Sequence, residues 1–339
     1  MTDTVLEVQN LSKIFPLPRP FFDAVRGKPA QKLIAVDQVN LKVERHETLG
    51  LVGESGCGKT TLGRTILRLY EPTSGKILFE NEDITHKNER DLQAIRSKMQ
   101  VVFQDPYSSL NPRMTVRQSI REVLRFHHVC APAEEEAYLQ NLLKTVGLSP
   151  ESADKYPRTF SGGQRQRIGL ARALAVQPTF LVADEPVSAL DVSIQAQILN
   201  LLADLRQELG LTMLFIAHEL SVVKHISSRV AVMYLGQVVE TGTTEEVFEN
   251  AQHPYTEGLL RALPRPEPGR RHRTAAVEGD IPSPLHMPSG CRFHTRCPIA
   301  EAICKTQAPP LRQLSPTHQV LCHLRPTPNW TPASATQPA

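Results

Sequence analysis

The octapeptide GESGCGKT at positions 53–60 has the residue types and spacing of a phosphate-binding loop. It fits the pattern G-x-x-x-x-G-K-[ST], follows an apolar stretch and precedes a helical pattern. Its glycines allow backbone N–H groups to turn towards phosphate oxygens, Lys59 has the reach to contact the β- and γ-phosphates, and the Thr60 hydroxyl suits Mg²⁺. The candidate nucleotide-binding residues, among which Cys57 is expected only to fit as a small side chain, are Gly53, Glu54, Ser55, Gly56, Cys57, Gly58, Lys59 and Thr60.

Two adjacent carboxylates, Asp184 and Glu185, end the apolar stretch FLVADE. An aspartate at the carboxyl end of a strand can hold Mg²⁺, while the following glutamate projects elsewhere and can polarise an attacking water. Without the phosphate loop upstream, an acidic strand end facing solvent would be the simpler interpretation. With that loop, we predict Asp184 as a Mg²⁺ ligand beside Thr60, and Glu185 as the general base.

Gln104 and His218 each follow an apolar stretch that is expected to form a strand. Ligands bind at the carboxyl ends of strands in open α/β sheets. A lone histidine at such an edge is more often structural, but two polar strand ends beside an acidic pair favour contact with a γ-phosphate. We therefore predict catalytic roles for Gln104 and His218, and Gln104 is also a candidate for the Mg²⁺ site.

The sequence SGGQRQR at positions 161–167 predicts a second anion site at the start of a helix. Ser161 is a good N-cap, and the glycines leave N–H groups bare at the positive end of the helix dipole. One nucleotide needs only one such cradle, so the second is explained if it closes over the nucleotide of another copy. The candidate residues are Ser161, Gly162, Gly163 and Gln164.

The elements that must position these residues follow from hydrophobic periodicity. Strand and helix patterns alternate outside residues 105–177, which predicts a mostly parallel sheet covered by helices. The expected strands are 48–52, 100–103, 180–184 and 211–217, with helices at 60–69 and 193–208. Helices alone are expected inside that segment, at 116–125, 133–146 and 162–176. The predicted fold class is α/β, with a helical subdomain inserted at about 106–177.

The 38 basic and 35 acidic side chains leave a net charge of only +3, and 5% of residues are aromatic. A protein that binds nucleic acid through phosphate neutralisation or base stacking is therefore disfavoured. No apolar stretch has the length of a membrane-spanning helix, and the first residues do not resemble a secretion signal. We expect the cysteines to lie in a reducing compartment.

A proline-rich stretch at 16–30 has two interpretations: a long surface loop between two strands, or a contact with a partner or a membrane surface. A composition boundary follows later, because 15 of the 27 prolines and four of the six cysteines lie after His253. The segment beyond it has few periodic apolar runs. We expect it to lack a core of its own and to gain order from a metal.

Four cysteines in this segment form a candidate metal site: Cys291, Cys297, Cys304 and Cys322. Four thiolates suit a structural Zn²⁺ or a [4Fe–4S] cluster, and the spacing matches neither the zinc-knuckle nor the ferredoxin pattern. Disulfides are disfavoured by the compartment and unrelated free thiols by the clustering. His294, His318 and His323 are alternative ligands, although each is more often an ordinary surface histidine.

Taken together, these motifs resemble the full set found in ATP-binding-cassette (ABC) ATPases, and the order and spacing agree. They include SALD at 188–191 in addition to the motifs above. The stretches FQDPYSSLNPRM, ADEPVSALDVSIQAQILNLL, MYLGQVVETG and HPYTEGLL resemble dipeptide and oligopeptide importers. The insertion after Phe15 is similar to the second, F-type ATPase subunit of dipeptide permeases. The resemblance covers residues 1 to about 325.

This resemblance implies a head-to-tail dimer with a second ABC ATPase subunit, expected to be a different chain. Two transmembrane permease subunits and an extracytoplasmic peptide-binding protein would complete the complex at the cytoplasmic face of the bacterial inner membrane. Phe15 resembles the residue that stacks on adenine, and Asp191 would lie at the dimer seam. Ser161 and Gly163 would contact the γ-phosphate held by the partner's phosphate loop, and residues 104–114 would face the permease. Thr60 and Thr61 preserve both hydroxyls of the usual Ser-Thr pair, so we expect active ATP hydrolysis.

The same resemblance favours [4Fe–4S] over Zn²⁺ in the tail. The expected organisation is an ABC ATPase domain at 1–250, a C-terminal extension with the four-cysteine site at 251–330 and a disordered tail at 331–339. The expected function is to energise import of dipeptides or oligopeptides. Alternatives are another small cargo, such as glutathione, a nickel chelate or a peptide antibiotic, a non-transport ABC ATPase, or an iron-sensing module.

Overall fold

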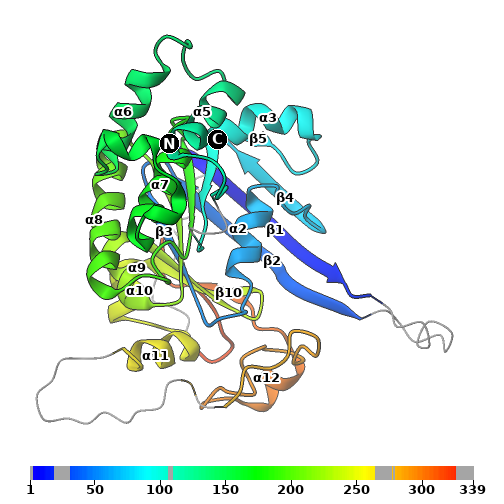
Figure 1. Ribbon diagram of the computed structural model, residues 1–339. Coiled ribbons are helices and arrows are strands. Elements are labelled where there is room, and N and C mark those ends of the chain that lie inside the picture. Colours follow the sequence, from blue (N-terminus) through cyan, green and yellow to red (C-terminus); the bar gives the residue numbers. More distant parts are fainter. Residues whose placement is uncertain (1–2, 19–30, 106–109, 264–276, 278, 326–339) are drawn as a thin grey trace, which may run out of the picture.

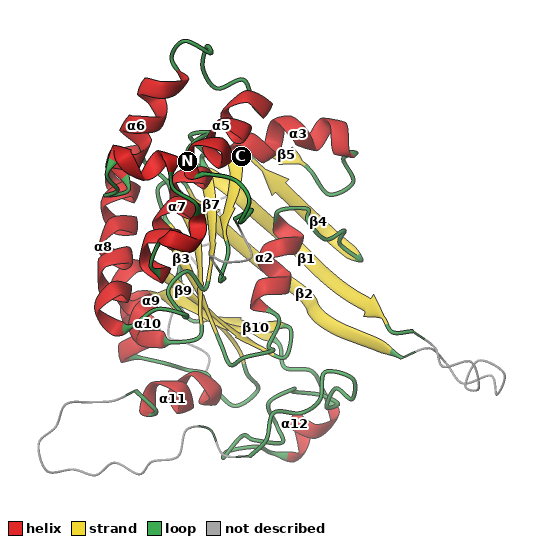
Figure 2. Cartoon of the chain, viewed as in Figure 1, coloured by secondary structure: helices red, strands yellow, loops and turns green. Residues whose placement is uncertain are grey.

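Two β-sheets organise the chain in the computed structural model, which describes residues 3–18, 31–105, 110–263, 277 and 279–325. The larger sheet has eight strands in the order β11-β12-β10-β9-β3-β8-β7-β6 (Figures 1 and 2). Strands β9, β3, β8, β7 and β6 are parallel, and β10, β12 and β11 continue the sheet in antiparallel pairing. The strands are β3 (Thr48–Val52), β6 (Met99–Val102), β7 (Phe180–Asp184), β8 (Thr212–Ala217), β9 (Arg229–Tyr234), β10 (Gln237–Thr243), β11 (Leu311–Gln313) and β12 (Gln319–Leu321).

The smaller sheet is antiparallel, with the order β2-β1-β4-β5. Its strands are β1 (Thr4–Pro16), β2 (Lys32–Glu44), β4 (Ser74–Phe79) and β5 (Glu82–Asp83). The expectation of a mostly parallel sheet did not include it, although two strands do flank the proline-rich stretch. Periodicity is a weak guide here because β1 shifts register along its length and because Asn10 and Gln38 have positive φ. Residues 19–30 lie outside the described residues.

Helices pack against the large sheet (Figure 2). They are α2 (Lys59–Ile66), α3 (Glu89–Lys98), α5 (Val116–Phe126), α6 (Glu135–Thr145), α7 (Gly162–Leu174), α8 (Val192–Leu209), α9 (Leu220–Ile226), α10 (Thr244–Glu249), α11 (Pro254–Arg261) and α12 (Ala302–Thr306). Short 3₁₀ helices lie at η1 (Pro150–Asp154) and η2 (Pro157–Thr159). The prediction that the first helix continues to residue 69 was wrong. It ends at Ile66 because Arg68 takes a left-handed φ of 54°.

The described part of the segment at 106–177 contains helices α5, α6 and α7 and the two 3₁₀ helices, as the sequence predicted. Arg117 joins α5 to the end of η1 through two hydrogen bonds to Asp154, at 2.7 and 3.0 Å. Arg125 makes a two-point contact with Glu135 at the start of α6, at 2.7 and 2.8 Å. These charged pairs on the outside, together with buried leucines such as Leu139 and Leu143, hold the helices as a unit.

The C-terminal segment obtains its order by joining the main fold. Strand β12 pairs with β10, so the segment extends the large sheet. Phe293 is 2% exposed and packs edge-on against Tyr234 at a centroid distance of 5.2 Å, inside the main hydrophobic core. The described part of the segment needs no separate core, because its buried aromatics Tyr255 and Phe293 pack into the main hydrophobic core. In Figure 1 it lies below β10, beside α11.

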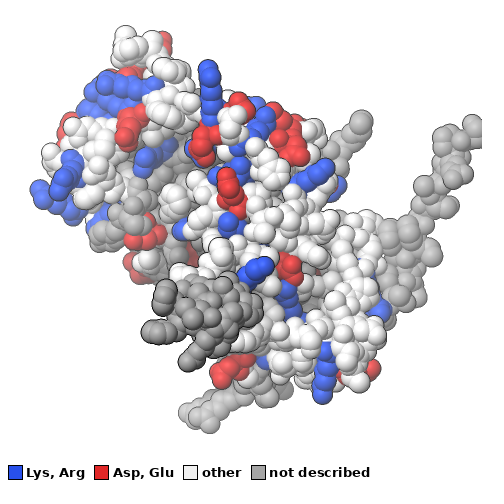
Figure 3. Space-filling view, turned by 90° about the vertical axis from the view of Figure 1, so that its right-hand side faces the viewer, with Lys and Arg blue, Asp and Glu red and all other residues white. Residues whose placement is uncertain are grey.

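Charge is mixed on the surface. On the face shown in Figure 3, basic and acidic side chains are interspersed, which agrees with a net charge of +3. Among the described residues, no helix has the combination of length and apolar character that crossing a membrane requires. The predicted disordered tail at 331–339 lies outside the described residues.

Candidate nucleotide-binding site

The carboxyl ends of four parallel strands meet at one edge of the large sheet. The register pairs Val52 with Ala217, Asp184 with Ile216, and Val102 with Ala183. Each candidate residue of the hydrolysis site follows or ends one of these strands. The sequence reasoning therefore placed these side chains correctly, because parallel strands with this register must end together.

The phosphate loop connects β3 to α2, and its shape depends on two glycines. Gly58 has a φ of 107°, and a Cβ there would lie 2.1 Å from the carbonyl oxygen of Ala35. A Cβ on Gly53 would lie 2.1 Å from the carbonyl oxygen of Met233. Gly56 has a φ of 77° and nothing within 4 Å of where its Cβ would be. The loop is thus pressed against the core at both ends and open in the middle, where an anion can approach.

Lys59 points into the loop and is 4% exposed. Its ammonium donates to the carbonyl oxygens of Gly53 at 2.8 Å and Glu54 at 3.1 Å. The Lys59 ammonium also lies 3.9 Å from Cys57 Sγ. A buried ammonium bonded to two neutral carbonyls is well suited to an added anion, because phosphate would supply the negative charge that these dipoles lack. The loop therefore fits a nucleotide phosphate chain.

A cavity of about 350 Å³ lies over the loop. Its walls come from β1, the start of β2, the phosphate loop and the turn after β9, and Phe15, the expected adenine-stacking residue, is among them. Phe15 is held by Tyr70, with ring centroids 5.5 Å apart and planes at 88°. The predicted residues that line the cavity are Phe15, Ser55, Gly56, Cys57, Gly58, Lys59, Thr60, Thr61, Gln104 and Glu185.

Gly53 and Glu54 are not among the lining residues. Gly53 is pressed against β9, and the Glu54 carboxylate is engaged by Arg296 on the side of the C-terminal segment. Their role as nucleotide contacts stays a prediction; in this structure both residues contact parts of the chain behind the loop. Cys57 is 3% exposed and fits as a packing residue, as expected.

Thr60 and Asp184 are joined directly across the site. The Thr60 hydroxyl donates to Asp184 Oδ1 at 2.8 Å, and Asp184 is 2% exposed. Burial raises the pKa of Asp184, while the hydrogen bond from Thr60 lowers it. A nearly buried carboxylate beside a hydroxyl forms an oxygen donor set of the kind that Mg²⁺ prefers, so these residues fit the ion.

Gln104, Glu185 and His218 converge. Gln104 Nε2 donates to Glu185 Oε2 at 2.8 Å, and His218 Nδ1 lies 3.7 Å from the same oxygen. The backbone of Glu185 has a left-handed φ of 47°. A non-glycine residue in this conformation is strained and is found most often where a side chain must be aimed. The three predicted catalytic residues thus form one group, of which Gln104 and Glu185 line the cavity.

Ser161, Gly162, Gly163, Gln164 and Asp191 do not line this cavity. Ser161 caps α7: its hydroxyl oxygen accepts from the Gln164 N–H at 3.3 Å, and Gln164 Oε1 accepts from the Ser161 N–H at 3.0 Å. Asp191 caps α8 by accepting the N–H of Ile194 at 3.0 Å. Gly163 is required here, because a Cβ would lie 2.4 Å from Ile194 Cγ2. These residues lie at the capped N-termini of α7 and α8, apart from the cavity over the phosphate loop.

The four cysteines of the tail are free thiols. The Cys291 N–H donates to the carbonyl of Cys304 at 2.8 Å. Burial, with smaller contributions from the neighbouring thiolates of Cys304, Cys322 and Cys297, raises the pKa of Cys291 to about 11. Within the described residues, however, no group of three or more metal-ligating side chains forms a metal site. The donor chemistry fits a thiolate-bound metal, but the side-chain placement does not by itself form the expected site.

The sequence reasoning missed two residues that border the loop. The Tyr255 hydroxyl accepts the N–H of Glu54 at 2.8 Å, and the Arg296 guanidinium bonds both Glu54 carboxylate oxygens. The only signal was the HPY triplet at 253–255, for which no role was predicted. Contacts more than 200 residues apart in the chain leave no spacing pattern that could identify them.

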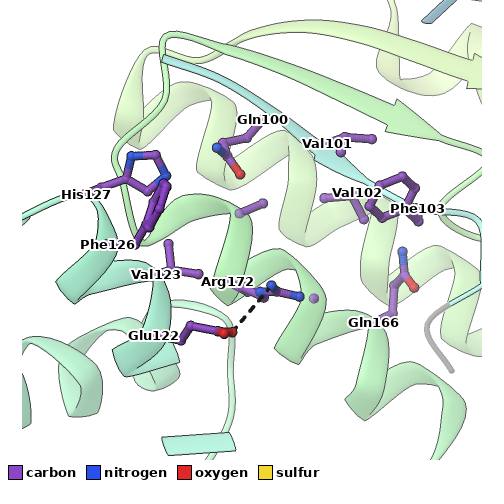
Figure 4. Close-up of a pocket in the computed structure, with 12 residues that line it drawn as sticks. Gln100, Val101, Val102, Phe103, Glu122, Val123, Phe126, His127, Gln166 and Arg172 are labelled. Carbon is purple, nitrogen blue, oxygen red and sulfur yellow. Dashed lines mark ion pairs between the residues drawn. The ribbon is translucent and has the colours of Figure 1, made fainter. Parts of the chain in front are cut away.

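A second cavity, of about 370 Å³, lies between the edge strand β6 and helices α5 and α7 (Figure 4). Phe126, at the end of α5, is 59% exposed and lines it beside His127. Glu122 of α5 and Arg172 of α7 form an ion pair at 3.9 Å across the two helices. We call this cavity the α5–α7 groove. It adjoins Phe103, directly before the loop at 104–114, of which residues 106–109 lie outside the described residues.

Two family models match the chain. The model of "ABC transporter" matches residues 36–188, and that of "Oligopeptide/dipeptide transporter, C-terminal region" matches residues 239–304. The oligopeptide transport ATP-binding protein AppF of Bacillus subtilis (strain 168) is 49% identical over 325 residues, which cover 95% of this chain and 98% of AppF. A putative peptide import ATP-binding protein of Brucella ovis is 50% identical over 287 residues, which cover 85% of this chain and 90% of that protein.

Solved structures agree on the fold. CbiO1 from Clostridium perfringens, part of an ABC transporter complex, matches with a TM-score of 0.62 and 27% identity, over 73% of this chain and 92% of that chain. The ATP-binding cassette MJ0796, in a dimeric post-hydrolysis state bound to ADP and Pi, matches with a TM-score of 0.62 and 28% identity, over 70% of this chain and 98% of that chain.

Proposed function

The chain belongs to the family of ABC transporter ATP-binding proteins, and from this membership we propose that it is the ATP-hydrolysing subunit of a peptide importer. The observation that carries the proposal is the convergence of Gln104, Glu185 and His218 next to the Thr60–Asp184 pair, where Thr60, Gln104 and Glu185 line the cavity above the phosphate loop. This is the arrangement needed to hold a triphosphate and to hydrolyse its terminal phosphate.

Each residue has a distinct task in this proposal. Lys59 and the loop N–H groups bind the phosphates, and Phe15 packs against the base. When bound, Mg²⁺ neutralises phosphate charge; Thr60, Asp184 and Gln104 are the residues that would hold it. Glu185 accepts a proton from the attacking water, and His218, 3.7 Å from its carboxylate, contacts the γ-phosphate side.

The second anion site supports a dimer. Ser161 and Gly163 lie at a capped helix start that does not border the chain's own cavity, so the nucleotide they would contact must be held by another ATPase subunit. We propose that this partner is a second, different ABC ATPase chain and that Asp191 lies at the seam. Closure over the nucleotide excludes water and completes the catalytic set.

The α5–α7 groove supports contact with the membrane partners. The groove contains the exposed side chain of Phe126 and lies next to the loop at 104–114. A permease segment that docks on the ATPase would bury apolar side chains in such a groove. We propose that two transmembrane permease subunits hold the chain at the cytoplasmic face of the bacterial inner membrane. A peptide-binding protein outside the membrane would deliver the cargo.

Peptides are the proposed cargo because the two relatives above carry peptide-transport names and because the matching C-terminal model is described for oligopeptide and dipeptide transporters. We expect the chain to co-purify from membranes with two hydrophobic subunits. ATP hydrolysis by that complex should rise several-fold when the binding protein is loaded with di- or oligopeptides. If only glutathione or a nickel chelate stimulates hydrolysis, that compound would replace peptides as the proposed cargo. ATP turnover that is independent of any membrane partner would contradict a transport function.

We also propose an ATPase domain at 1–250 and an extension at 251–330 in which Cys291, Cys297, Cys304 and Cys322 hold a [4Fe–4S] cluster. Support comes from the donor set of four thiols and from the neighbouring thiols, which contribute to the raised pKa values of Cys291 and Cys297. Protein purified without oxygen should be brown and contain iron and acid-labile sulfide. A colourless protein that contains one zinc per chain would contradict the cluster and assign the four cysteines to Zn²⁺.

A further inference from the structure

The C-terminal segment holds one residue of the phosphate loop at two points. The Glu54 N–H donates to the Tyr255 hydroxyl at 2.8 Å. The Glu54 carboxylate accepts two bonds from Arg296, with Nη1–Oε2 at 2.7 Å and Nη2–Oε1 at 3.0 Å. Backbone and side chain of the same loop residue are therefore both bonded by residues that lie beyond residue 250 in the sequence.

The Arg296 contact is rigid. Its side chain is 4% exposed, and that of Glu54 is 23% exposed. The guanidinium also donates to the carbonyl of Val277 at 3.1 Å and lies 5.8 Å from the centre of the Tyr234 ring. Hydrogen bonds to Glu54 raise the pKa of Arg296. A planar guanidinium held on three sides fixes the carboxylate opposite it more firmly than a lysine could.

Glu54 in turn organises the loop. Its carbonyl oxygen accepts from Lys59 Nζ at 3.1 Å and from the Cys57 N–H at 3.3 Å. Rotation of the Glu54 peptide group would therefore move the ammonium that binds phosphate and the turn that presents the loop N–H groups. A constraint on Glu54 therefore also restrains the Lys59 ammonium and the Cys57 N–H, because both are hydrogen-bonded to its carbonyl oxygen.

We propose that Arg296 is a positioning residue for ATP binding, which acts by holding Glu54 and so pre-forming the phosphate loop. This inference rests on the proposed ATPase function and assigns a task to the C-terminal segment within it. A loop that is held before the nucleotide arrives loses less freedom on binding. Arg296 acts on nucleotide affinity, whereas Glu185 acts on the rate of hydrolysis.

The test is the affinity of the full chain for mant-ATP with Mg²⁺, measured by fluorescence titration. We expect Arg296→Gln to weaken binding about tenfold, as for loss of a partly buried charge-assisted pair. The KM for ATP should rise by a similar factor, with kcat within about twofold. Glu54→Gln should have the same effect, and the double variant should be no weaker than either single variant, because the two residues act through one another. Arg296→Lys should be intermediate.

Arg312→Gln is the matched control, because Arg312 lies in the same segment and bonds only carbonyls within it among the described residues, those of His323 and Arg325. Its affinity for mant-ATP should equal that of the wild type. Equal affinity of the wild type and Arg296→Gln, or equal weakening by Arg312→Gln, would overturn the inference. Failure of the wild-type chain to bind mant-ATP would instead contradict the proposed function. If Arg296→Gln does not fold, Glu54→Gln and Arg296→Lys decide the question.

Discussion

Glu185 combines a strained backbone with a polar neighbour. Its φ of 47° lies in the left-handed region, and its carboxylate accepts from Gln104 at 2.8 Å. The strain is sustained because the Glu185 N–H is bonded to the carbonyl of Ile216 at 3.0 Å, which ties the residue to the end of β8. The carboxylate is thus aimed by the sheet and does not depend on a flexible loop.

We expect Glu185→Gln to bind ATP with unchanged affinity while hydrolysis falls about 10²- to 10⁴-fold, because an amide cannot accept the proton of water. Phosphate release and mant-ATP titration measure the two effects. Glu219→Gln is the control, since Glu219 also lies near His218, at 3.5 Å, but has no proposed role in hydrolysis. Equal rates for wild type and Glu185→Gln would remove Glu185 from the role of base.

His253 is buried at the start of α11 and gives the fold a dependence on pH. It is 1% exposed, and its Nδ1 accepts the Tyr255 N–H at 3.1 Å. Burial lowers its pKa from 6.5 to about 4. Below pH 6.5 the unfolded chain takes up a proton that the folded chain excludes, so stability is lost as the pH falls from 6.5 towards 4.

This residue should contribute a loss of about 2 kcal/mol between pH 8 and pH 5. His253→Asn removes the titration and keeps a capping acceptor. We expect the difference in urea midpoint between the two pH values to shrink in His253→Asn and to persist in His86→Asn, because His86 is exposed. The same pH dependence in both variants would assign the acid sensitivity to other groups.

Among the elements, helix α8 begins at a motif residue, Asp191, that has a structural role in addition to its proposed role at the dimer seam. Asp191 accepts the N–H of Ile194 at 3.0 Å and the hydroxyl of Ser193 at 2.8 Å. These bonds lower its pKa and satisfy a free N–H group at the start of an 18-residue helix. The proposed dimer-seam residue is therefore also an N-cap.

Asp191→Ala should lower the melting temperature by about 2 °C through loss of the cap, whereas Asp191→Asn should leave it unchanged. Differential scanning calorimetry on the full chain separates the two variants. A fall in ATP hydrolysis by the assembled complex in Asp191→Asn, without a change in melting temperature, would isolate the seam role. An unchanged melting temperature in Asp191→Ala would show that the cap contributes nothing.

At the scale of the whole molecule, the phosphate loop and the helix start proposed to bind an anion do not meet within the described residues. Ser161 is the N-cap of α7, but the cavity over Lys59 is lined by other residues. Two half-sites on one chain are explained by an assembly in which each chain completes the site of its neighbour.

In the purified complex, Ser161→Ala should reduce photolabelling of the partner ATPase by azido-ATP several-fold while labelling of this chain is retained. Lys59→Ala should show the opposite pattern, because Lys59 lies in this chain's own loop. Ser149→Ala is the control, since Ser149 precedes η1 and makes no side-chain capping bond. Loss of labelling on this chain in Ser161→Ala would place Ser161 at its own nucleotide.

The sequence by itself determined the candidate hydrolysis site. Residues such as Gln104, Asp184 and His218 follow apolar strands, and the parallel pairing of those strands brings their ends together. Local pattern is sufficient here because each residue's place depends only on its own strand and on a common direction. The cap of α7 was equally predictable, because a serine before two glycines acts over a few residues.

Only the tertiary structure decided how the C-terminal segment meets the ATPase core. Arg296 and Glu54 are 242 residues apart, and strand β12 pairs with strand β10, which lies far from it in the sequence. Such contacts depend on the packing of Phe293 into the core and on the ion pair of the buried Arg296 guanidinium with the Glu54 carboxylate. The composition boundary after His253 indicated only that the segment differs in composition from the rest of the chain. The physical reason it is ordered lies in long-range packing, which no local spacing encodes.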